Sequence, residues 1–319
     1  MKNVLITGIS GFAGSFLAEH LLTQNDVEIH GTYLTDQSLD LVASTKEKLH
    51  LEKVNLMDAS AVEHLIEKIK PDEIYHLAAL TSPAGSFDNP AETISNNISA
   101  EIYLLAAIKK AKCTDCRIMI TSSADIYGNV KSDDLPIDEE TPLRPVSPYA
   151  VSKIAQDYLG LQYFLSDDLH IFRVRPFNHI GPRQSPHFVV PAFAKQIAEI
   201  EKGKSGPIIK VGNLESKKDF TDVRDMVKAY ALLMEKAADG EVYNIGSGKS
   251  VQIKEILDTL LSFSTEKISV EQDPERFREN LIPDLVADSS KMQELTGWTP
   301  EIPIDQTLED TLTYWREHA

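Results

Sequence analysis

The sequence lacks the features that mark several large classes of protein. It contains only two cysteines, Cys113 and Cys116, in 319 residues. Cysteine can therefore supply neither a disulfide framework nor the four ligands of a structural zinc site. No second ligand pair and no thioredoxin-like context accompany the two residues, so we expect inert, reduced thiols and no metal site.

Long apolar runs are missing as well. No segment approaches the ~20 residues that a membrane helix needs. The opening stretch, MKNVLITGISGF, has too short an apolar run and too many glycines for a signal peptide. We therefore expect a cytoplasmic protein with no membrane partner.

Positive charge is scarce. Asp and Glu together number 49 against 32 Lys and Arg, which gives a formal net charge of -17. Nucleic-acid backbones require a basic surface, and no long basic stripe is present, so we expect no nucleic-acid partner. An anionic small ligand would have to be bound locally, by glycine turns, helix N-termini or single cations.

The composition that remains is that of an enzyme-sized soluble chain, and its pattern predicts the fold. Short apolar strands alternate with amphipathic helices: the strands are KNVLIT, VEIHGTYL, EIYHLAAL and RIMITSS, and the helices are AVEHLIEKIK and AEIYLLAAIKKAK. This alternation predicts an α/β fold with a doubly wound parallel Rossmann sheet. Ligands bind beyond the carboxyl ends of such strands, so residues 8–14, 76–81 and 122–128 should line one crevice.

A glycine turn follows the first predicted strand and precedes a helix. The turn reads GISGFAG, residues 8–14. Its glycines let the turn close and let backbone N–H groups approach a pyrophosphate at the positive end of the helix. A tight turn without a ligand is the plainer alternative, but the order of strand, turn and helix favours dinucleotide binding.

A second chemical element is SPYAVSK, residues 147–153, which begins another predicted helix. Ser147 can cap this helix, and Tyr149 and Lys153 stand four residues apart on one face. An ammonium near a phenol favours the phenolate, so we expect the pKa of Tyr149 to fall toward the range of a proton-transfer catalyst. Such a pair is also common on ordinary helix surfaces.

Taken together, the glycine turn, a serine after the predicted strand RIMIT and the YAVSK segment resemble the extended short-chain dehydrogenase/reductase family, in its nucleotide-sugar branch. The resemblance covers the whole chain. It implies a catalytic triad of Ser123, Tyr149 and Lys153, in which Lys153 also binds the nicotinamide ribose. The cofactor contacts that it implies are Gly8, Gly11, Phe12, Ala13, Gly14, Asn55, Leu56, Leu77, Ala78, Ala79, Tyr149 and Lys153.

Three segments resemble one particular activity within this branch. VRPFNHIGPRQS, FVVPAFAKQIAEIEKG and PIIKVGNLESKKDFTDVRD are similar to those of the family's reductases of GDP-4-keto-6-deoxy-mannose, as is the triplet Ser123, Ala124 and Asp125. The resemblance thus implies NAD(P)H-dependent reduction of a C4 ketone on a GDP-sugar, which gives GDP-6-deoxy-D-mannose.

Other activities of the family stay open. GDP-mannose 4,6-dehydratase is the main alternative, but its glycine turn typically has Gln-Asp where this chain has Phe12 and Ala13. Another nucleotide-sugar 4-epimerase or dehydratase, and a non-catalytic nicotinamide-binding protein, are more distant alternatives. Asp125 has two interpretations of equal weight, contact with the sugar or capping of a turn.

The residues at the end of the second predicted strand do not decide between NADPH and NADH. Thr32, Tyr33 and Leu34 occupy the place where a Rossmann fold that prefers NAD carries Asp or Glu, and Asp36 comes too late. No arginine for a phosphate stands there either. We expect both NADPH and NADH to be used, with NADPH slightly preferred.

The resemblance also implies a smaller C-terminal α/β domain that binds the nucleotide sugar. The predicted division gives residues 1–175 and about 214–248 to the Rossmann domain, and about 176–213 and 249–319 to the smaller one. The implied substrate contacts are Ser86, Ser123, Asn178, Val189, Lys195, Val211, Lys218 and Arg278. Lys218 stands where the family usually has arginine. Lysine keeps the positive charge but cannot form the two parallel hydrogen bonds of a guanidinium. Helices near 97–113 and 147–166 resemble those that form a homodimer in the family.

Overall fold

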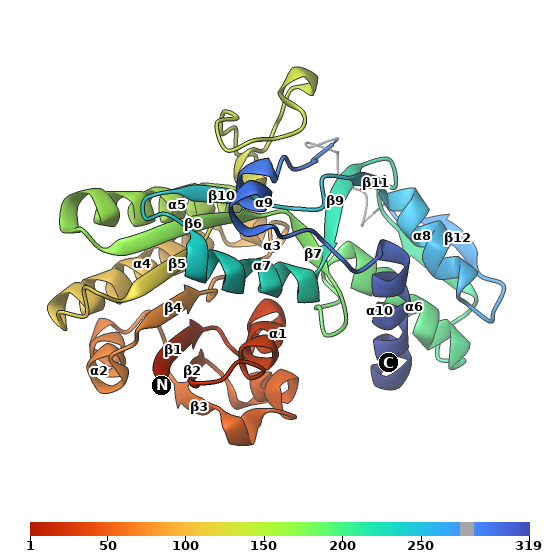
Figure 1. The fold of residues 1–319 in the computed structure, drawn as a ribbon. Coiled ribbons are helices and arrows are strands. Elements are labelled where there is room, and N and C mark those ends of the chain that lie inside the picture. Colours follow the sequence, from red (N-terminus) through yellow and green to blue (C-terminus); the bar gives the residue numbers. More distant parts are fainter. Residues whose placement is uncertain (275–283) are drawn as a thin grey trace.

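The computed structural model describes residues 1–274 and 284–319, and a parallel sheet of seven strands runs through its centre (Figure 1). In spatial order the strands are β10 (Val242–Ile245), β6 (His170–Pro176), β5 (Arg117–Thr121), β4 (Glu73–His76), β1 (Lys2–Thr7), β2 (Val27–Tyr33) and β3 (His50–Lys53). The chain order reverses direction between β1 and β4, which is the arrangement of a doubly wound sheet. The predicted fold class is therefore confirmed.

Helices cover both faces of this sheet. On one face lie α1 (Phe12–Leu21) and α7 (Val223–Lys236), and on the other lie α2 (Ala59–Ile69), α4 (Pro90–Lys110) and α5 (Pro148–Asp167). Each face has its own hydrophobic core, with Leu17 and Tyr230 in the first and Leu104 and Ile118 in the second. Strands buried on both faces explain the nearly continuous apolar runs of the sequence.

Two predicted element boundaries differ from the structure by four residues or more, and one side chain explains the first. The strand expected over 73–80 ends at His76, because Asn97 of α4 takes the place of a neighbouring strand beyond it. Its amide accepts a hydrogen bond from Leu80 N at 2.8 Å and donates one to Leu80 O at 3.1 Å. The helix expected from residue 100 begins ten residues earlier, at Pro90, where the Asn89 side chain caps it.

The second lobe is built around a third hydrophobic core. It contains α6 (Val189–Glu201), α8 (Ile253–Ser262) and α10 (Ile304–His318), which lie together at the right of Figure 1. Two small sheets complete it: β11 (Ser250–Gln252), β9 (Lys217–Asp222) and β7 (Asn178–Ile180) form one, and β12 (Ser269–Gln272) and β8 (Ile208–Val211) form the other. The remaining elements are α3 (Gly85–Asp88), α9 (Ser290–Thr296), η1 (Asp36–Val42), η2 (Lys46–Lys48), η3 (Ala124–Ile126) and η4 (Ser132–Asp134).

Some elements cross the predicted domain division. β9 pairs with β7 and β11, although the division places it in the Rossmann domain. Met292 and Trp298 belong to the core between the large sheet and α1 and α7, although the division places them in the smaller domain. The boundaries themselves stay a prediction.

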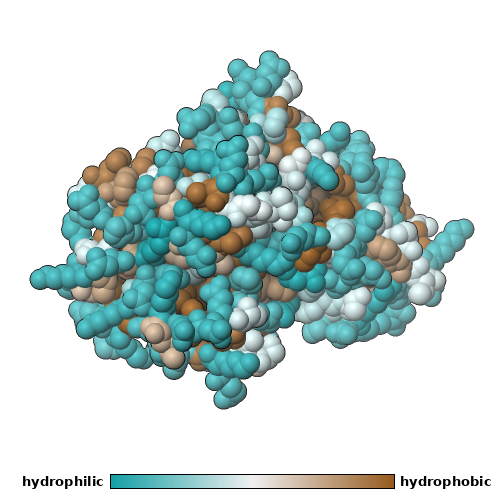
Figure 2. All heavy atoms as spheres, in the orientation of Figure 1, coloured by the Kyte–Doolittle hydropathy of each residue, from teal (hydrophilic) through white to brown (hydrophobic). Residues whose placement is uncertain are grey.

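The surface that faces the reader in Figure 2 is mostly hydrophilic, with hydrophobic atoms in separate small areas. None of the helices in the described residues has the length and apolar character that crossing a bilayer requires.

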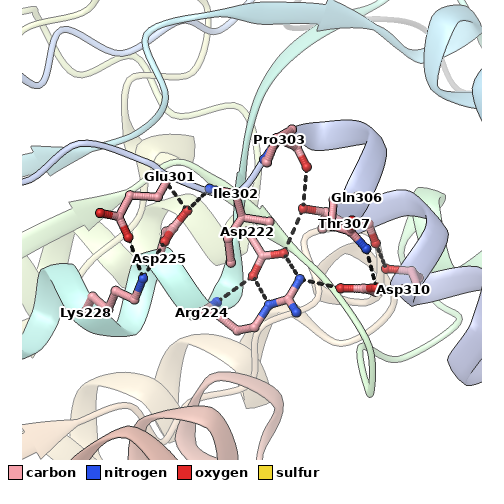
Figure 3. Close-up of polar contacts among 11 residues, drawn as sticks. Asp222, Arg224, Asp225, Lys228, Glu301, Ile302, Pro303, Gln306, Thr307 and Asp310 are labelled. Atoms are coloured by element: carbon pink, nitrogen blue, oxygen red, sulfur yellow. Dashed lines mark hydrogen bonds and ion pairs between the residues drawn. The ribbon is translucent and has the colours of Figure 1, made fainter.

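Two carboxylates at the start of α7 join the lobes (Figure 3). Asp222 caps α7 by accepting a hydrogen bond from Arg224 N, and it also accepts one from the Thr307 hydroxyl of α10 at 2.7 Å. Asp225, whose side chain is fully buried, accepts hydrogen bonds from Glu301 N and Ile302 N, each at 2.8 Å. The segment before α10 is thus fixed to a helix of the Rossmann sheet. We call these contacts the α7 clamp.

Asp225→Ala should lower the free energy of unfolding by about 1–3 kcal/mol, because two backbone N–H groups lose their acceptor. The measurement is a urea titration followed by circular dichroism. Lys228→Ala is the matched control: it removes the partly exposed partner of Asp225 and should cost no more than about 1 kcal/mol. Equal losses in the two variants would contradict a structural role for the buried carboxylate.

Candidate active site

A cavity of about 690 Å³ lies beyond the carboxyl ends of β1, β4 and β5. Its walls include the glycine turn, the segment after β4, the segment after β5 and two side chains of α5, Tyr149 and Lys153. The crevice predicted from the strand ends is therefore present. The second lobe closes one side with residues around Asn178 and Val189.

The glycine turn has the geometry that a bound diphosphate needs. Gly8 has a φ of 72°, in the left-handed region that glycine tolerates, and its carbonyl accepts a hydrogen bond from Gly11 N. A Cβ on Gly14 would lie 2.3 Å from Gly8 O, so only glycine fits there. Gly11 begins α1 without a side-chain cap, which leaves the first backbone N–H groups of the helix available to an anion.

Hydroxyl groups surround the outer end of the cavity, near the end of β2. Thr32, Tyr33, Leu34, Thr35 and Ser38 line it, and the Ser38 and Ser10 hydroxyls are hydrogen bonded at 2.8 Å. No carboxylate of the described residues lines this end. Asp36 binds Lys53 Nζ at 2.9 Å instead. The lining also includes all the predicted cofactor contacts: Gly8, Gly11, Phe12, Ala13, Gly14, Asn55, Leu56, Leu77, Ala78, Ala79, Tyr149 and Lys153.

Ser123 and Tyr149 lie together at the inner end of the cavity. Ser123 follows β5 and accepts a hydrogen bond from Asp125 N at 3.1 Å, which opens the short helix η3. Tyr149 sits in the first turn of α5, which Ser147 caps by accepting from Ala150 N, as the sequence predicts. The phenol lies close enough to the Ser123 side chain for that contact to lower the pKa of Tyr149.

The expected effect of Lys153 on the phenol is wrong for this structure. Burial raises the pKa of Tyr149, the nearby Asp125 raises it further, and only the influence of the Ser123 side chain opposes them. Lys153 Nζ donates to Thr121 O and to Gln156 Oε1, each at 2.8 Å. Burial lowers the pKa of Lys153 to about 8. The phenol is therefore held in its protonated form.

Asp125 lies in the cavity wall, close to Lys218. Burial raises the pKa of the Asp125 carboxyl, and the positive charge of Lys218 opposes that rise. Among the described residues no backbone N–H donates to the Asp125 carboxylate, and the turn is capped by Ser123 instead. The geometry thus favours the first of the two interpretations of Asp125, contact with a bound ligand.

The predicted substrate contacts are not all brought together. Asn178, Val189 and Ser123 line the cavity, whereas Arg278 lies outside the described residues. The other four are not in the cavity lining: Ser86 is buried and bonded to Pro83 O, Val211 is in the core of the second lobe, Lys195 lies over the Trp315 ring, and the charge of Lys218 acts on Asp125. Contacts from these residues stay predictions.

Sequence reasoning missed one cation that lines the cavity. Arg183, with a φ of 72°, follows β7 and reaches back to α1, where it pairs with Glu19 at 2.8 Å and lies over the Phe16 ring. An arginine directly after Gly-Pro in HIGPRQ was the available signal. The described residues contain no group of three or more His, Cys, Asp or Glu side chains arranged to hold a metal ion.

Comparison with known proteins places this geometry among sugar-nucleotide enzymes. A family model described as GDP-mannose 4,6 dehydratase matches residues 5–311. The chain is 32% identical over 318 residues to the GDP-6-deoxy-D-mannose reductase of Pseudomonas aeruginosa, which covers 100% of this chain and 98% of that protein. It is 28% identical over 323 residues to GDP-mannose 4,6 dehydratase 1 of Arabidopsis thaliana, covering 97% and 88%. The structure of RMD from Pseudomonas aeruginosa complexed with NADPH matches with a TM-score of 0.88 at 30% identity and covers 100% of both chains.

Proposed function

The chain belongs to the GDP-mannose 4,6 dehydratase family of extended short-chain dehydrogenases/reductases, and on this premise we propose that it reduces GDP-4-keto-6-deoxy-D-mannose. The reaction converts the C4 ketone to a hydroxyl and gives GDP-6-deoxy-D-mannose, also called GDP-D-rhamnose. NADPH or NADH is the hydride donor. The reaction takes place in the cytoplasm, where free thiols such as Cys113 and Cys116 persist.

The observation that carries this proposal is the full-length likeness to a reductase of this substrate class, at 32% identity. The site agrees with the direction of the reaction. A reduction needs a proton donor in its first chemical step, and the buried phenol of Tyr149 is held protonated beside the Ser123 hydroxyl. A dehydratase or epimerase begins instead by removing a proton from the sugar.

Three side chains have separate roles in the proposed reaction. Tyr149 donates its phenolic proton to the ketone oxygen as C4 is reduced, and the Ser123 hydroxyl stabilises the same oxygen. Lys153 uses two of its three N–H groups on Thr121 O and Gln156 Oε1, which leaves one for the ribose of the cofactor. The bound nicotinamide supplies the hydride.

The residues present fit such a cofactor. The left-handed Gly8, the close approach of Gly14 to Gly8 O and the uncapped N-terminus of α1 suit a pyrophosphate. At the adenosine end, hydroxyls of Ser10 and Ser38 and the lack of a carboxylate among the described lining residues accommodate a 2′-phosphate as well as a 2′-hydroxyl. We therefore infer that both NADPH and NADH bind and that NADPH is slightly preferred.

Dehydration of GDP-mannose is the second candidate, because the family model carries that name and Asp125 is an acid beside the triad. The carboxyl of Asp125 is paired electrostatically with Lys218. We assign the Asp125 carboxylate to orienting the sugar, with Lys218 as its counter-charge, rather than to removing a proton from C5.

Tyr149→Phe should reduce turnover of the keto sugar by ~10²–10⁴-fold, because only the donated proton is lost. NADPH affinity should stay near that of the wild type, since Tyr149 is only one of the predicted cofactor contacts and the others remain. Stopped-flow absorbance gives the turnover, and nicotinamide fluorescence gives the affinity. Full activity in the variant would rule out the assigned proton donor.

The second prediction separates reductase from dehydratase. With GDP-mannose alone the protein should form no 4-keto-6-deoxy sugar, whereas with the keto sugar it should oxidise one equivalent of NAD(P)H per product. Asp125→Asn should stay within about tenfold of wild-type reductase activity, because an orienting contact is worth about 1.4 kcal/mol or less. Mass spectrometry of the products checks both arms. Keto sugar formed from GDP-mannose alone, and abolished by Asp125→Asn, would favour the dehydratase.

We further propose a homodimer formed through α4 and α5. Val151, Tyr158 and Leu165 are exposed at intervals of seven residues along α5, which places them in one stripe on its outer face. A stripe of this kind on a long surface helix is suited to burial against a second copy.

Tyr158→Glu should convert the dimer to a monomer, because it puts a charge into that stripe. Light scattering after size-exclusion chromatography gives the mass. Lys254→Glu is the control, since it changes an exposed residue of α8 in the second lobe and should leave the mass unchanged. A wild-type protein that is monomeric at all concentrations would contradict the proposed dimer.

A further inference from the structure

A fully buried carboxyl group lies beneath the cavity and has no role in the proposed reaction. Glu101 belongs to α4, and it is 0% exposed. Among the described residues no hydrogen bond of ordinary geometry reaches either of its carboxyl oxygens. A buried carboxyl without a full set of partners destabilises a fold unless something nearby compensates for it.

The compensating group is Lys153, reached through Gln156. Gln156 lies on α5, one turn after Lys153, and it is also fully buried. Its Oε1 accepts a hydrogen bond from Lys153 Nζ at 2.8 Å. Its amide lies close enough to the Glu101 carboxyl to lower the pKa of that group, although it is not aligned for a regular hydrogen bond. The three side chains form a short buried chain from α4 to the floor of the cavity.

The charges of the two ends depend on each other. Burial raises the pKa of Glu101 well above its usual range, and Lys153 opposes this rise. Burial lowers the pKa of Lys153 to about 8, and Glu101 opposes that fall. When Glu101 is ionised, its negative charge offsets that of the buried ammonium, so loss of the carboxyl would let Lys153 lose its proton at a lower pH.

The other groups that face this pair do not replace it. Asp157 of α5 raises the pKa of Glu101 but is ion-paired with Arg173 and Arg175, each at 2.8 Å. His76 at the end of β4 is neutral at physiological pH, because burial and the charge of Lys153 lower its pKa to about 3. Burial raises the pKa of Tyr163 of α5, and the negative charge of Glu101 raises it further. α2, which packs on the other side of α4, contributes no charged group to the pKa of Glu101.

We propose that Glu101 is a positioning residue for Lys153: through Gln156 it holds the ammonium against the cavity floor and keeps it charged at neutral pH. The inference rests on the proposed function for the role of Lys153. Glu101 itself touches neither the cofactor nor the sugar. Its effect on the reaction passes through the lysine, which in the proposed function binds the ribose of the nicotinamide cofactor.

The test is the pH dependence of two separate quantities, the dissociation constant for NADPH and kcat/KM for the keto sugar, from about pH 6 to about pH 10. Glu101→Gln should move the upper pH limit of both to lower pH. At about pH 8 it should weaken NADPH binding and lower kcat/KM by about tenfold each, which corresponds to one pKa unit. Glu101→Asp keeps the charge and should restore part of the loss.

Two further variants sharpen the assignment. Gln156→Leu breaks the link and should shift the limit in the same direction, and combining it with Glu101→Gln should add little, because both act on one lysine. Glu63→Gln is the matched control. Glu63 lies on α2 and pairs at the surface with Lys110 of α4, the helix that carries Glu101. Its loss should leave both pH profiles unchanged. If Glu101→Gln does not fold, Glu101→Asp and Gln156→Leu carry the test.

The outcomes are distinct. Variants that are less stable but whose pH profiles overlay that of the wild type would overturn the proposal, because Glu101 would then serve packing alone. A wild-type protein that binds neither NADPH nor NADH would overturn it as well. A wild type that binds NADPH but does not reduce the keto sugar would overturn the proposed substrate only, since the binding profile still tests Glu101.

Discussion

The parallel hydrogen bonding of β1, β4 and β5 is the constraint on which the rest of the structure depends. The register aligns Thr7 with His76 and His76 with Ile120, so the three strands end at one level of the sheet. Segments far apart in the sequence therefore emerge side by side: the glycine turn, the residues after β4 and the residues that carry Ser123. Every group of the proposed chemistry is attached to this edge or to a helix that packs against it.

Features that depend on neighbouring residues were predictable from the sequence. The alternation of strands and helices, the glycine turn and the Ser147 cap all follow from local patterns, and the structure contains them. Boundaries failed where a distant side chain intervened, as Asn97 does at the end of β4. The predicted direction of the Tyr149 pKa shift was wrong for a related reason. Spacing on a helix gives the distance to Lys153, but the burial and the Asp125 charge that raise this pKa come from the tertiary fold.

The substrate side was the least predictable part of the site. Its implied residues were transferred by resemblance, and resemblance does not say whether a side chain such as Val211 faces a cavity or a core. Arg183 and Glu101 were missed because their meaning lies in contacts with α1 and α5, far away in the sequence. An acidic residue within the apolar stretch AEIYLLAAI was a visible anomaly, but only the packing of α4 on α5 connects it with a lysine.

The position of β10 at the edge of the large sheet has a consequence for how the chain is made. The strand pairs with β6, yet the chain between them builds β7, α6, β8 and β9 of the second lobe. As the protein emerges from the ribosome, β6 cannot pair with β10 until Val242–Ile245 has been synthesised. The α7 clamp cannot form until Ile302 has been synthesised. The edge of β6 has no strand partner until then, which is the kind of edge at which intermolecular strand pairing can begin.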